Sequence, residues 1–219
     1  MGSGAGPFMC NSCGKHELHR KQMENWTDIR AWRKTERVRL IAERMALRGE
    51  TRARHNVAIT GALETLLSPA MIIGFYWPIR GEYDARKLIS ALIDRGARAA
   101  MPVVVEKGAP LVFRDWHPGA RMENGFWNIP VPAEGEPVTP TTLLVPLVGF
   151  DEMGYRLGYG GGYYDRTLAS LPAKPLAIGV GYELSYLGTI YPQPHDIPLS
   201  AIVTEGRVLR GTAACAPIS

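Results

Sequence analysis

The stretch from residue 150 to residue 166, FDEMGYRLGYGGGYYDR, has the composition of a phosphate-binding loop. Its glycines lack a Cβ and let backbone N–H groups turn toward one point; they are Gly158, Gly160, Gly161 and Gly162. A helix expected from about Tyr163 would add its own free N–H groups and the positive end of its dipole. The stretch matches neither the P-loop pattern nor the dinucleotide fingerprint. It therefore predicts an anion-binding loop of another kind.

Charged and aromatic side chains around these glycines distinguish a binding site from a plain structural turn. Arg156 can hold two phosphate oxygens at once, and Asp165 offers the hard oxygen that Mg2+ prefers. Tyr163 and Tyr164 stand directly before Asp165. A glycine cluster by itself is also typical of structural turns, but such a turn needs none of these side chains. Their presence favours the binding site.

A second group of candidate ligands lies near the N-terminus, where Cys10, Cys13, His16 and His19 form the pattern C-x2-C-x2-H-x2-H. These residue types suit Zn2+, but the two pairs follow each other too closely for a usual finger, which needs a loop between them. Residues 1–26 are otherwise small, polar and aperiodic. We expect a flexible extension there, with a bound metal as the alternative.

Composition excludes several classes of protein. The 219 residues are 46% hydrophobic and 21% charged, as is usual for one globular domain. No apolar run approaches the ~20 residues of a membrane span, and no secretory signal opens the sequence. The odd cysteine count, three, indicates reduced thiols. We expect a cytoplasmic protein and exclude a membrane protein or a secreted disulfide scaffold.

Positive charge is concentrated in residues 15–54, which hold 12 of the 25 Lys and Arg residues against six acids. A polyphosphate ligand, a nucleic acid or a solvated helix face would each account for such a cluster. Because no stacking-aromatic motif or groove-reading module accompanies the charge, nucleic-acid binding is the least favoured of the three.

The elements that must position these residues alternate between strands and helices. Helices are expected at 27–47, 52–67, 82–96 and from residue 163, and strands at 71–77, 97–106, 109–116, 142–150, 174–182 and 201–210. Such alternation gives βαβ units, hence a three-layer α/β/α fold with a mostly parallel open sheet and room for an antiparallel strand or two. We predict one domain at 27–212 and a tail at 213–219. Residues 117–140, rich in Pro, Gly and Asn, form a long excursion of the functional or disordered kind.

With its flanks, the glycine stretch LVPLVGFDEMGYRLGYGGGYYDR resembles the signature of the 5-formyltetrahydrofolate cyclo-ligase family, also called methenyltetrahydrofolate synthetases. Further blocks resemble that family in the same order: GFYWP followed by Glu82, MPVV (101–104), FRDWHPG (113–119), FWNIPVP (126–132) and PHDIPLSAIVTE (194–205). The resemblance covers roughly residues 29–209. It implies a fold similar to the sugar-phosphate isomerase and CoA-transferase group.

The resemblance also implies a reaction. 5-Formyltetrahydrofolate would be cyclised to 5,10-methenyltetrahydrofolate, with ATP as co-substrate and Mg2+ as cofactor, releasing ADP and phosphate. The formyl oxygen is a poor leaving group, so it would first attack the γ-phosphate to give a phosphorylated imidate, and N10 would then close the ring. Such phosphoryl transfer needs cations, backbone donors and a metal at the phosphates.

At the phosphates, residue roles follow from the matched motifs. The resemblance implies that the loop from Gly154 to Gly162, with Tyr163, wraps the ATP phosphates and that Arg156 faces their charge. It makes Asp165 and Asp196 the magnesium ligands. The implied catalytic set is Arg156, Tyr164 and Asp165.

On the folate, the resemblance implies that Glu82 accepts hydrogen bonds from the N–H edge of the pterin. Tyr164 would pack against the pterin, and Tyr76 and Trp116 would line the same cleft. Trp116 is equally well explained as a core residue. A buried Glu82 without a partner, in contrast, would be too costly to be structural.

The family also places a lysine and an arginine, four residues apart in the first helix, on the nucleotide. Arg33 and Arg37 have that spacing and share a helix face, whereas Lys34 would take the lysine's place with Val38 at the arginine's. We assign Lys34 and Arg37 to the nucleotide, with Arg33 as the alternative. Many members carry a lysine within the glycine loop where this chain has Gly161, so some phosphate charge must be met elsewhere.

Two alternatives to this enzyme follow from these departures. One is a paralogue that binds reduced folate without turning it over, and the other is ATP-driven cyclisation of a different N-formyl compound. In each case the partner is a small molecule, with or without a polyglutamate tail on the folate, and neither a nucleic acid nor a membrane.

Overall fold

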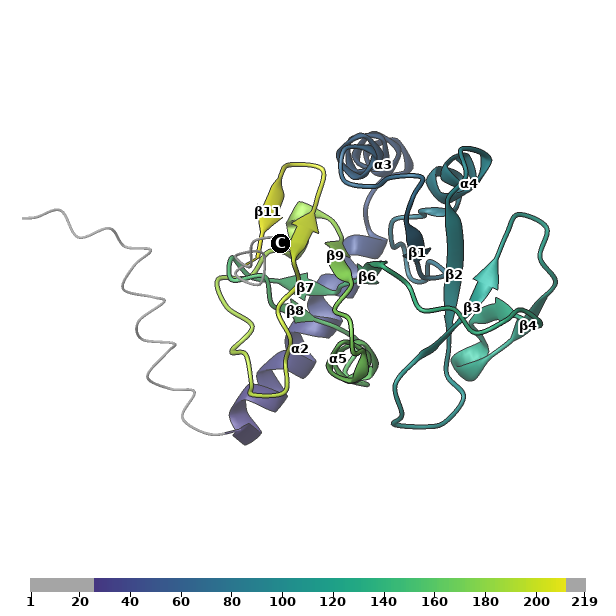
Figure 1. Ribbon diagram of the computed structural model, residues 1–219. Helices are drawn as coiled ribbons and strands as arrows, with labels where there is room; N and C mark the ends of the chain where they lie inside the picture. Colours follow the sequence, from purple (N-terminus) through teal and green to yellow (C-terminus); the bar gives the residue numbers. More distant parts are fainter. Residues whose placement is uncertain (1–25, 212–219) are drawn as a thin grey trace, which may run out of the picture.

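The computed structural model describes residues 26–211 and contains one seven-stranded sheet in the order β11-β10-β9-β6-β1-β2-β3 (Figure 1). These strands are β1 (Ile72–Gly74), β2 (Arg98–Val103), β3 (Val112–Trp116), β6 (Thr142–Pro146), β9 (Leu176–Val180), β10 (Ala201–Val203) and β11 (Val208–Arg210). The five central strands pair in parallel, and β3 and β11 run antiparallel at the two edges. The predicted α/β fold with a mostly parallel sheet is therefore confirmed.

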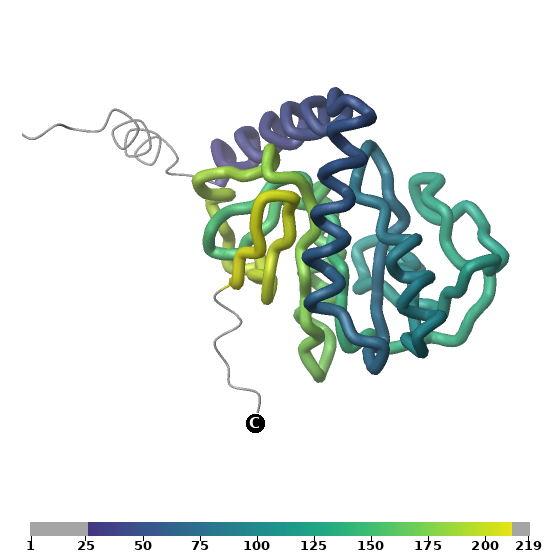
Figure 2. Tube along the Cα trace, turned by 90° about the horizontal axis from the view of Figure 1, so that it is seen from above, coloured from purple at the N-terminus to yellow at the C-terminus, as the bar shows by residue number. Residues whose placement is uncertain are grey.

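Helices cover both faces of the sheet: α2 (Trp26–Met45), α3 (Gly49–Glu64), α4 (Arg86–Asp94) and α5 (Tyr163–Ser170). On one face, Leu63 of α3 and Ile89 of α4 pack against Ile73 of β1. On the other, Leu168 of α5 packs against Val145 of β6. Figures 1 and 2 show α3 and α4 side by side along the sheet, and Figure 1 shows α5 on its opposite face. The three layers bury two apolar clusters with the sheet between them.

The first helix, α2, differs from the others because it crosses one end of the sheet (Figure 2). Asp28 in its first turn and Arg44 in its last turn suit the helix dipole. Its apolar side, Leu40 above all, packs against Leu157 and Ile190. This packing leaves the arginines of α2 beside the segments that follow the parallel strands.

Shorter elements replace three of the longer predictions. The excursion at 117–140 contains an ordered hairpin, β4 (Met122–Asn124) and β5 (Pro130–Pro132), joined through the 3-10 helix η1 (Phe126–Asn128). The predicted strand 142–150 divides into β6 and β7 (Gly149–Phe150), which pairs with β8 (Arg156–Leu157). The predicted strand 201–210 is a hairpin, because the Thr204 hydroxyl accepts hydrogen bonds from two backbone N–H groups of its turn. The 3-10 helix η2 (Glu183–Ser185) follows β9.

Within residues 26–211, no helix has the length and hydrophobicity needed to cross a bilayer. The cluster Cys10, Cys13, His16 and His19, together with Cys215, lies outside the described residues.

Gly74 is essential for close packing at the centre of the sheet. A Cβ at this position would collide with the side chains of Leu143, Pro140 and Phe113. Gly74→Ala is expected to lower the free energy of unfolding by about 1–3 kcal/mol through overpacking, measured by urea denaturation. The control is Gly61→Ala in α3, where a Cβ would meet nothing within 4 Å. Equal stability of the two variants would contradict this account.

Candidate active site

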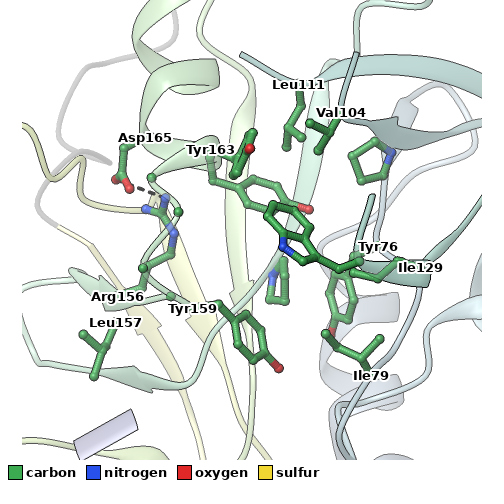
Figure 3. Close-up of a pocket in the computed structure, with 18 of the residues that line it drawn as sticks. Tyr76, Ile79, Val104, Leu111, Ile129, Arg156, Leu157, Tyr159, Tyr163 and Asp165 are labelled. Atoms are coloured by element: carbon green, nitrogen blue, oxygen red, sulfur yellow. Dashed lines mark ion pairs between the residues drawn. The ribbon is translucent and has the colours of Figure 1, made fainter. Parts of the chain in front are cut away.

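A cavity of about 730 Å³ opens where the parallel strands β1, β2 and β6 end. Its walls come from α2, the segment after β1, the hairpin β4–β5, the glycine loop with the start of α5, and residues 195–196. Figure 3 shows Arg156 and Asp165 on one wall and Tyr76 and Ile79 on the opposite wall. Ligands of open α/β sheets bind at this edge, so the position is that of a binding site.

The glycine loop has a backbone that only glycine adopts readily. Gly160 has φ +94° and Gly162, the N-cap of α5, has φ +65°. Two arginines bind its carbonyl oxygens: Arg37 Nε donates to the Gly158 oxygen at 2.7 Å and Arg166 Nη2 to the Gly161 oxygen at 2.7 Å. Because Gly162 is the N-cap of α5, the loop leads directly into the N-terminus of that helix, as the sequence predicts.

Arg156 and Asp165 form a fixed pair beside this loop. Arg156 Nη2 lies 3.0 Å from Asp165 Oδ1, and the arginine side chain is buried. Ile197 braces both residues, because its N–H donates to Asp165 at 3.1 Å and its carbonyl accepts from Arg156 Nη1 at 3.1 Å. The guanidinium is therefore oriented before any anion binds.

Asp196 is held in the same way by the first helix. Arg33 Nη2 donates to Asp196 Oδ2 at 2.6 Å, and the Gln193 N–H donates to the same oxygen at 2.7 Å. The Arg33 Nε binds the Ile190 carbonyl at 2.9 Å. Each of the two carboxylates assigned to magnesium by the resemblance thus has an arginine partner.

Glu82 lies in the inner part of the cavity with a nearly buried side chain. Its Oε1 accepts a hydrogen bond from the Tyr159 hydroxyl at 2.6 Å and lies 3.8 Å from Arg44 Nη2. Its Oε2 accepts from the Ile79 N–H at 2.9 Å. The sequence argument for a ligand at Glu82 holds only for a buried carboxylate without a partner, and the structure does not meet that condition, because Tyr159, Ile79 and Arg44 are partners. Glu82 is explained structurally without a ligand, although it still lines the cavity.

Burial raises the pKa of the Glu82 carboxyl, while the Tyr159 hydroxyl, the Ile79 N–H and Arg44 oppose the shift. The folded state therefore holds this proton more tightly than the unfolded state, and the contribution of Glu82 to stability falls as pH rises from about 4 toward neutrality. Glu82→Gln lacks this titration. We expect its free energy of unfolding, relative to wild type, to rise with pH between pH 4 and 7 in urea titrations.

The control for this experiment is Glu50→Gln, at an exposed position in α3. It measures what the replacement of an exposed glutamate by glutamine does to the unfolding free energy at each pH. Parallel curves for Glu82→Gln and wild type would contradict the raised pKa.

Aromatic rings line the space between the glycine loop and the hairpin. Tyr76 and Tyr164 lie in the wall, and burial raises the pKa of both phenols. At the mouth, Trp127 of the hairpin is 66% exposed and lies edge-on to Tyr163 with ring centroids 5.5 Å apart. These rings provide flat apolar surfaces for a ligand with aromatic rings.

Most of the predicted site residues meet at this cavity: Arg33, Arg37, Tyr76, Glu82, Arg156, Gly158, Gly160, Gly161, Gly162, Tyr163, Tyr164, Asp165 and Asp196. Three are placed elsewhere. Lys34 is exposed and outside the cavity lining, whereas Arg33 and Arg37 are within it. Gly154 forms a buried turn next to Leu199, and Trp116 packs edge-on against Phe75 in the core. For Trp116 the structure favours the core alternative.

Other lining residues were missed by the sequence analysis, notably Arg30, Arg80, Trp127, Tyr159 and His195. The spacing of Arg30, Arg33 and Arg37, three and then four residues, places them on one helix face and could have revealed Arg30. The remaining residues gave no such signal, because they lie on the hairpin or on loops, whose course depends on the whole fold.

The sequence of this chain matches one known protein family over most of its length. The family model described as the 5-formyltetrahydrofolate cyclo-ligase family matches residues 29–205. The chain belongs to the 5-formyltetrahydrofolate cyclo-ligase family. The matched region contains every residue that lines the cavity except Trp26, so the cavity lies within the part of this chain that matches the family.

Individual members of the cyclo-ligase family are similar over most of their length. The 5-formyltetrahydrofolate cyclo-ligase of Escherichia coli K12 is 34% identical over 146 residues, covering 64% of this chain and 80% of that protein. The enzyme of the same name from Mycolicibacterium smegmatis is 31% identical over 182 residues, covering 78% and 92%. The NMR structure of Aquifex aeolicus 5,10-methenyltetrahydrofolate synthetase, 29% identical, matches with a TM-score of 0.72 over 85% of this chain and 95% of that one.

Proposed function

We propose that this protein is an ATP- and Mg2+-dependent 5-formyltetrahydrofolate cyclo-ligase, which forms 5,10-methenyltetrahydrofolate, ADP and phosphate. The observation that carries the proposal is one cavity that joins a glycine loop and the Arg156–Asp165 pair to aromatic walls and an inner carboxylate, Glu82. The names of the similar proteins support the same substrate and product.

In this proposal the ATP phosphates lie against the glycine loop. The chain meets their charge with Arg156 and with the α2 arginines Arg30, Arg33 and Arg37, all of which line the cavity. These cations supply the positive charge that many family members provide with a lysine at the position of Gly161. Because Arg156 is already oriented by Asp165 and Ile197, little reorganisation is needed when the phosphoryl group is transferred.

The folate occupies the remainder of the cavity, with its rings between Tyr76, Tyr164 and Trp127. The formyl oxygen is directed toward the γ-phosphate and attacks it; the bond between the γ-phosphorus and ADP breaks, ADP leaves, and a phosphorylated imidate forms. N10 then adds to the formyl carbon and loses its proton, and the carbon–oxygen bond breaks to release phosphate. Glu82 lies at the inner end, where it can accept hydrogen bonds from the pterin N–H edge in addition to those it receives from the protein.

The donor set of the cavity fits a magnesium ion that is bound mainly by substrate phosphates. Among residues 26–211, no three His, Cys, Asp or Glu side chains form a metal-binding group. Mg2+ commonly uses only one or two carboxylates together with phosphates and water, and Asp165 and Asp196 would supply these. When bound, the ion neutralises charge on the phosphates.

The decisive experiment follows the near-ultraviolet absorbance of methenyltetrahydrofolate. Purified protein is mixed with 5-formyltetrahydrofolate and Mg2+, with and without ATP. We expect a rise in absorbance that requires ATP and is lost when the metal is chelated. Binding of 5-formyltetrahydrofolate in calorimetry without any rise would contradict the enzyme and favour a paralogue that only binds folate. An ATP-dependent reaction with another N-formyl compound alone would contradict the substrate assignment.

A further inference from the structure

A partly buried chain of hydrogen bonds joins the first helix, the glycine loop and Glu82. Arg44 Nη2 donates to the Tyr159 hydroxyl at 2.7 Å, and that hydroxyl donates to Glu82 Oε1 at 2.6 Å. Arg44 is 2% exposed. The Tyr159 hydroxyl is thus both acceptor and donor between a cation and a carboxylate.

Two of the three members of this chain are fixed by the backbone around them. Arg44 Nε donates to the Arg80 carbonyl at 3.0 Å and Nη1 to the Leu147 carbonyl at 3.0 Å. Glu82 Oε2 accepts from the Ile79 N–H at 2.9 Å. The guanidinium is therefore held by two backbone contacts, whereas the carboxylate has one and receives its other hydrogen bond from the glycine loop through Tyr159.

Tyr159 is the member that belongs to the loop. It stands between Gly158 and Gly160, is 38% exposed, and lies in the cavity between the two walls (Figure 3). Because its backbone is part of the anion-binding loop and its hydroxyl binds Glu82, a shift of the loop must lengthen or shorten the 2.6 Å hydrogen bond. The two ends of the cavity share this residue.

We propose that Tyr159 is a positioning residue that couples the phosphate end of the cavity to the folate end. The inference rests on the proposed function. A nucleotide that settles on the glycine loop fixes Tyr159, which holds Glu82 in the position that receives the folate. By linkage, folate on Glu82 favours the same loop position, so each ligand tightens the binding of the other by the same factor.

The test measures this factor by calorimetry. 5-Formyltetrahydrofolate is titrated into the full chain in the presence of Mg2+, with and without a non-hydrolysable ATP analogue. For wild type we expect the analogue to tighten folate binding by about 5-fold or more, the lower end of typical couplings. In Tyr159→Phe, which lacks only the hydroxyl, we expect a factor below about 2-fold, while each ligand alone still binds.

The matched control is Tyr186→Phe, because the Tyr186 hydroxyl donates to Glu152 at 2.9 Å in an exposed pair outside the cavity lining. It should keep the wild-type factor. Tyr159→Leu is a second variant that also lacks the hydroxyl and must show the same loss, and circular dichroism verifies that each variant is folded.

The outcomes separate the two proposals. If wild type and Tyr159→Phe show the same factor, or wild type shows none although both ligands bind, the coupling role is overturned and the proposed function stands. If wild type binds neither ligand, the proposed function is overturned and the coupling role with it.

Discussion

Asp165→Asn is expected to reduce the rate of methenyltetrahydrofolate formation by on the order of 10²–10³-fold, as is usual when an electrostatic group at a transition state is lost. Asparagine keeps an oxygen that can accept the Ile197 N–H and face Arg156, which in the wild type lie 3.1 Å and 3.0 Å from Asp165 Oδ1. The local structure should therefore persist. What is lost is the negative charge that balances Arg156 and attracts Mg2+.

The rate is measured as a function of Mg2+ concentration, because a lost metal ligand should also raise the concentration needed for half-maximal activity. The control is Asp94→Asn, at the exposed end of α4, which should leave both quantities unchanged. Wild-type rates and an unchanged Mg2+ requirement in Asp165→Asn would exclude Asp165 from the metal site.

Arg44→Met is expected to produce the largest loss of stability, about 3–5 kcal/mol, because it removes one partner of a buried charged pair. Methionine fills much of the space of the arginine but donates no hydrogen bond. The carbonyl oxygens of Arg80 and Leu147 and the Tyr159 hydroxyl would lose their donor, and Glu82 would lose its nearest cation. The measurement is urea denaturation followed by circular dichroism.

Arg39→Met on the same helix is the matched control. Arg39 forms ion pairs with Glu36 at 2.6 Å and Glu43 at 2.8 Å, but it is exposed. Exposed pairs contribute about 0–1 kcal/mol, so a small effect is expected. Comparable losses for the two variants would show that the buried contacts of Arg44 contribute little.

The glycine loop could be predicted from the sequence because its chemistry is local. Glycines that supply positive φ, an arginine before them and an aspartate in the first turn of the next helix all lie within a dozen positions, and the order of strands and helices places them at the correct edge of the sheet. Asp196 and Glu82 could be placed only through the resemblance to the family, since nothing near them in the sequence indicates that they meet Asp165 in one cavity.

Predictions failed where a contact over a long sequence distance decides the outcome. Lys34 and Arg33 are neighbours on one helix, and only the position of the segment 190–196 shows that Arg33 faces the cavity. The partner of Glu82 is 77 residues away in the loop, so its hydrogen bond to Tyr159 could not be anticipated. Trp116 shows the same difficulty. The sequence alone does not distinguish an aromatic residue that packs in the hydrophobic core from one that lines the cavity.

The hydrogen bonds between α2 and residues 190–196 have a consequence for biosynthesis. Arg33 is made early, yet its partners Ile190 and Asp196 follow 157 and 163 residues later. The sheet centre and the glycine loop can assemble while the ribosome is still translating, but this wall of the cavity cannot. We therefore expect nascent or truncated chains that stop before Ile190 to bind no ligand, and the protein to become competent only when translation is nearly complete.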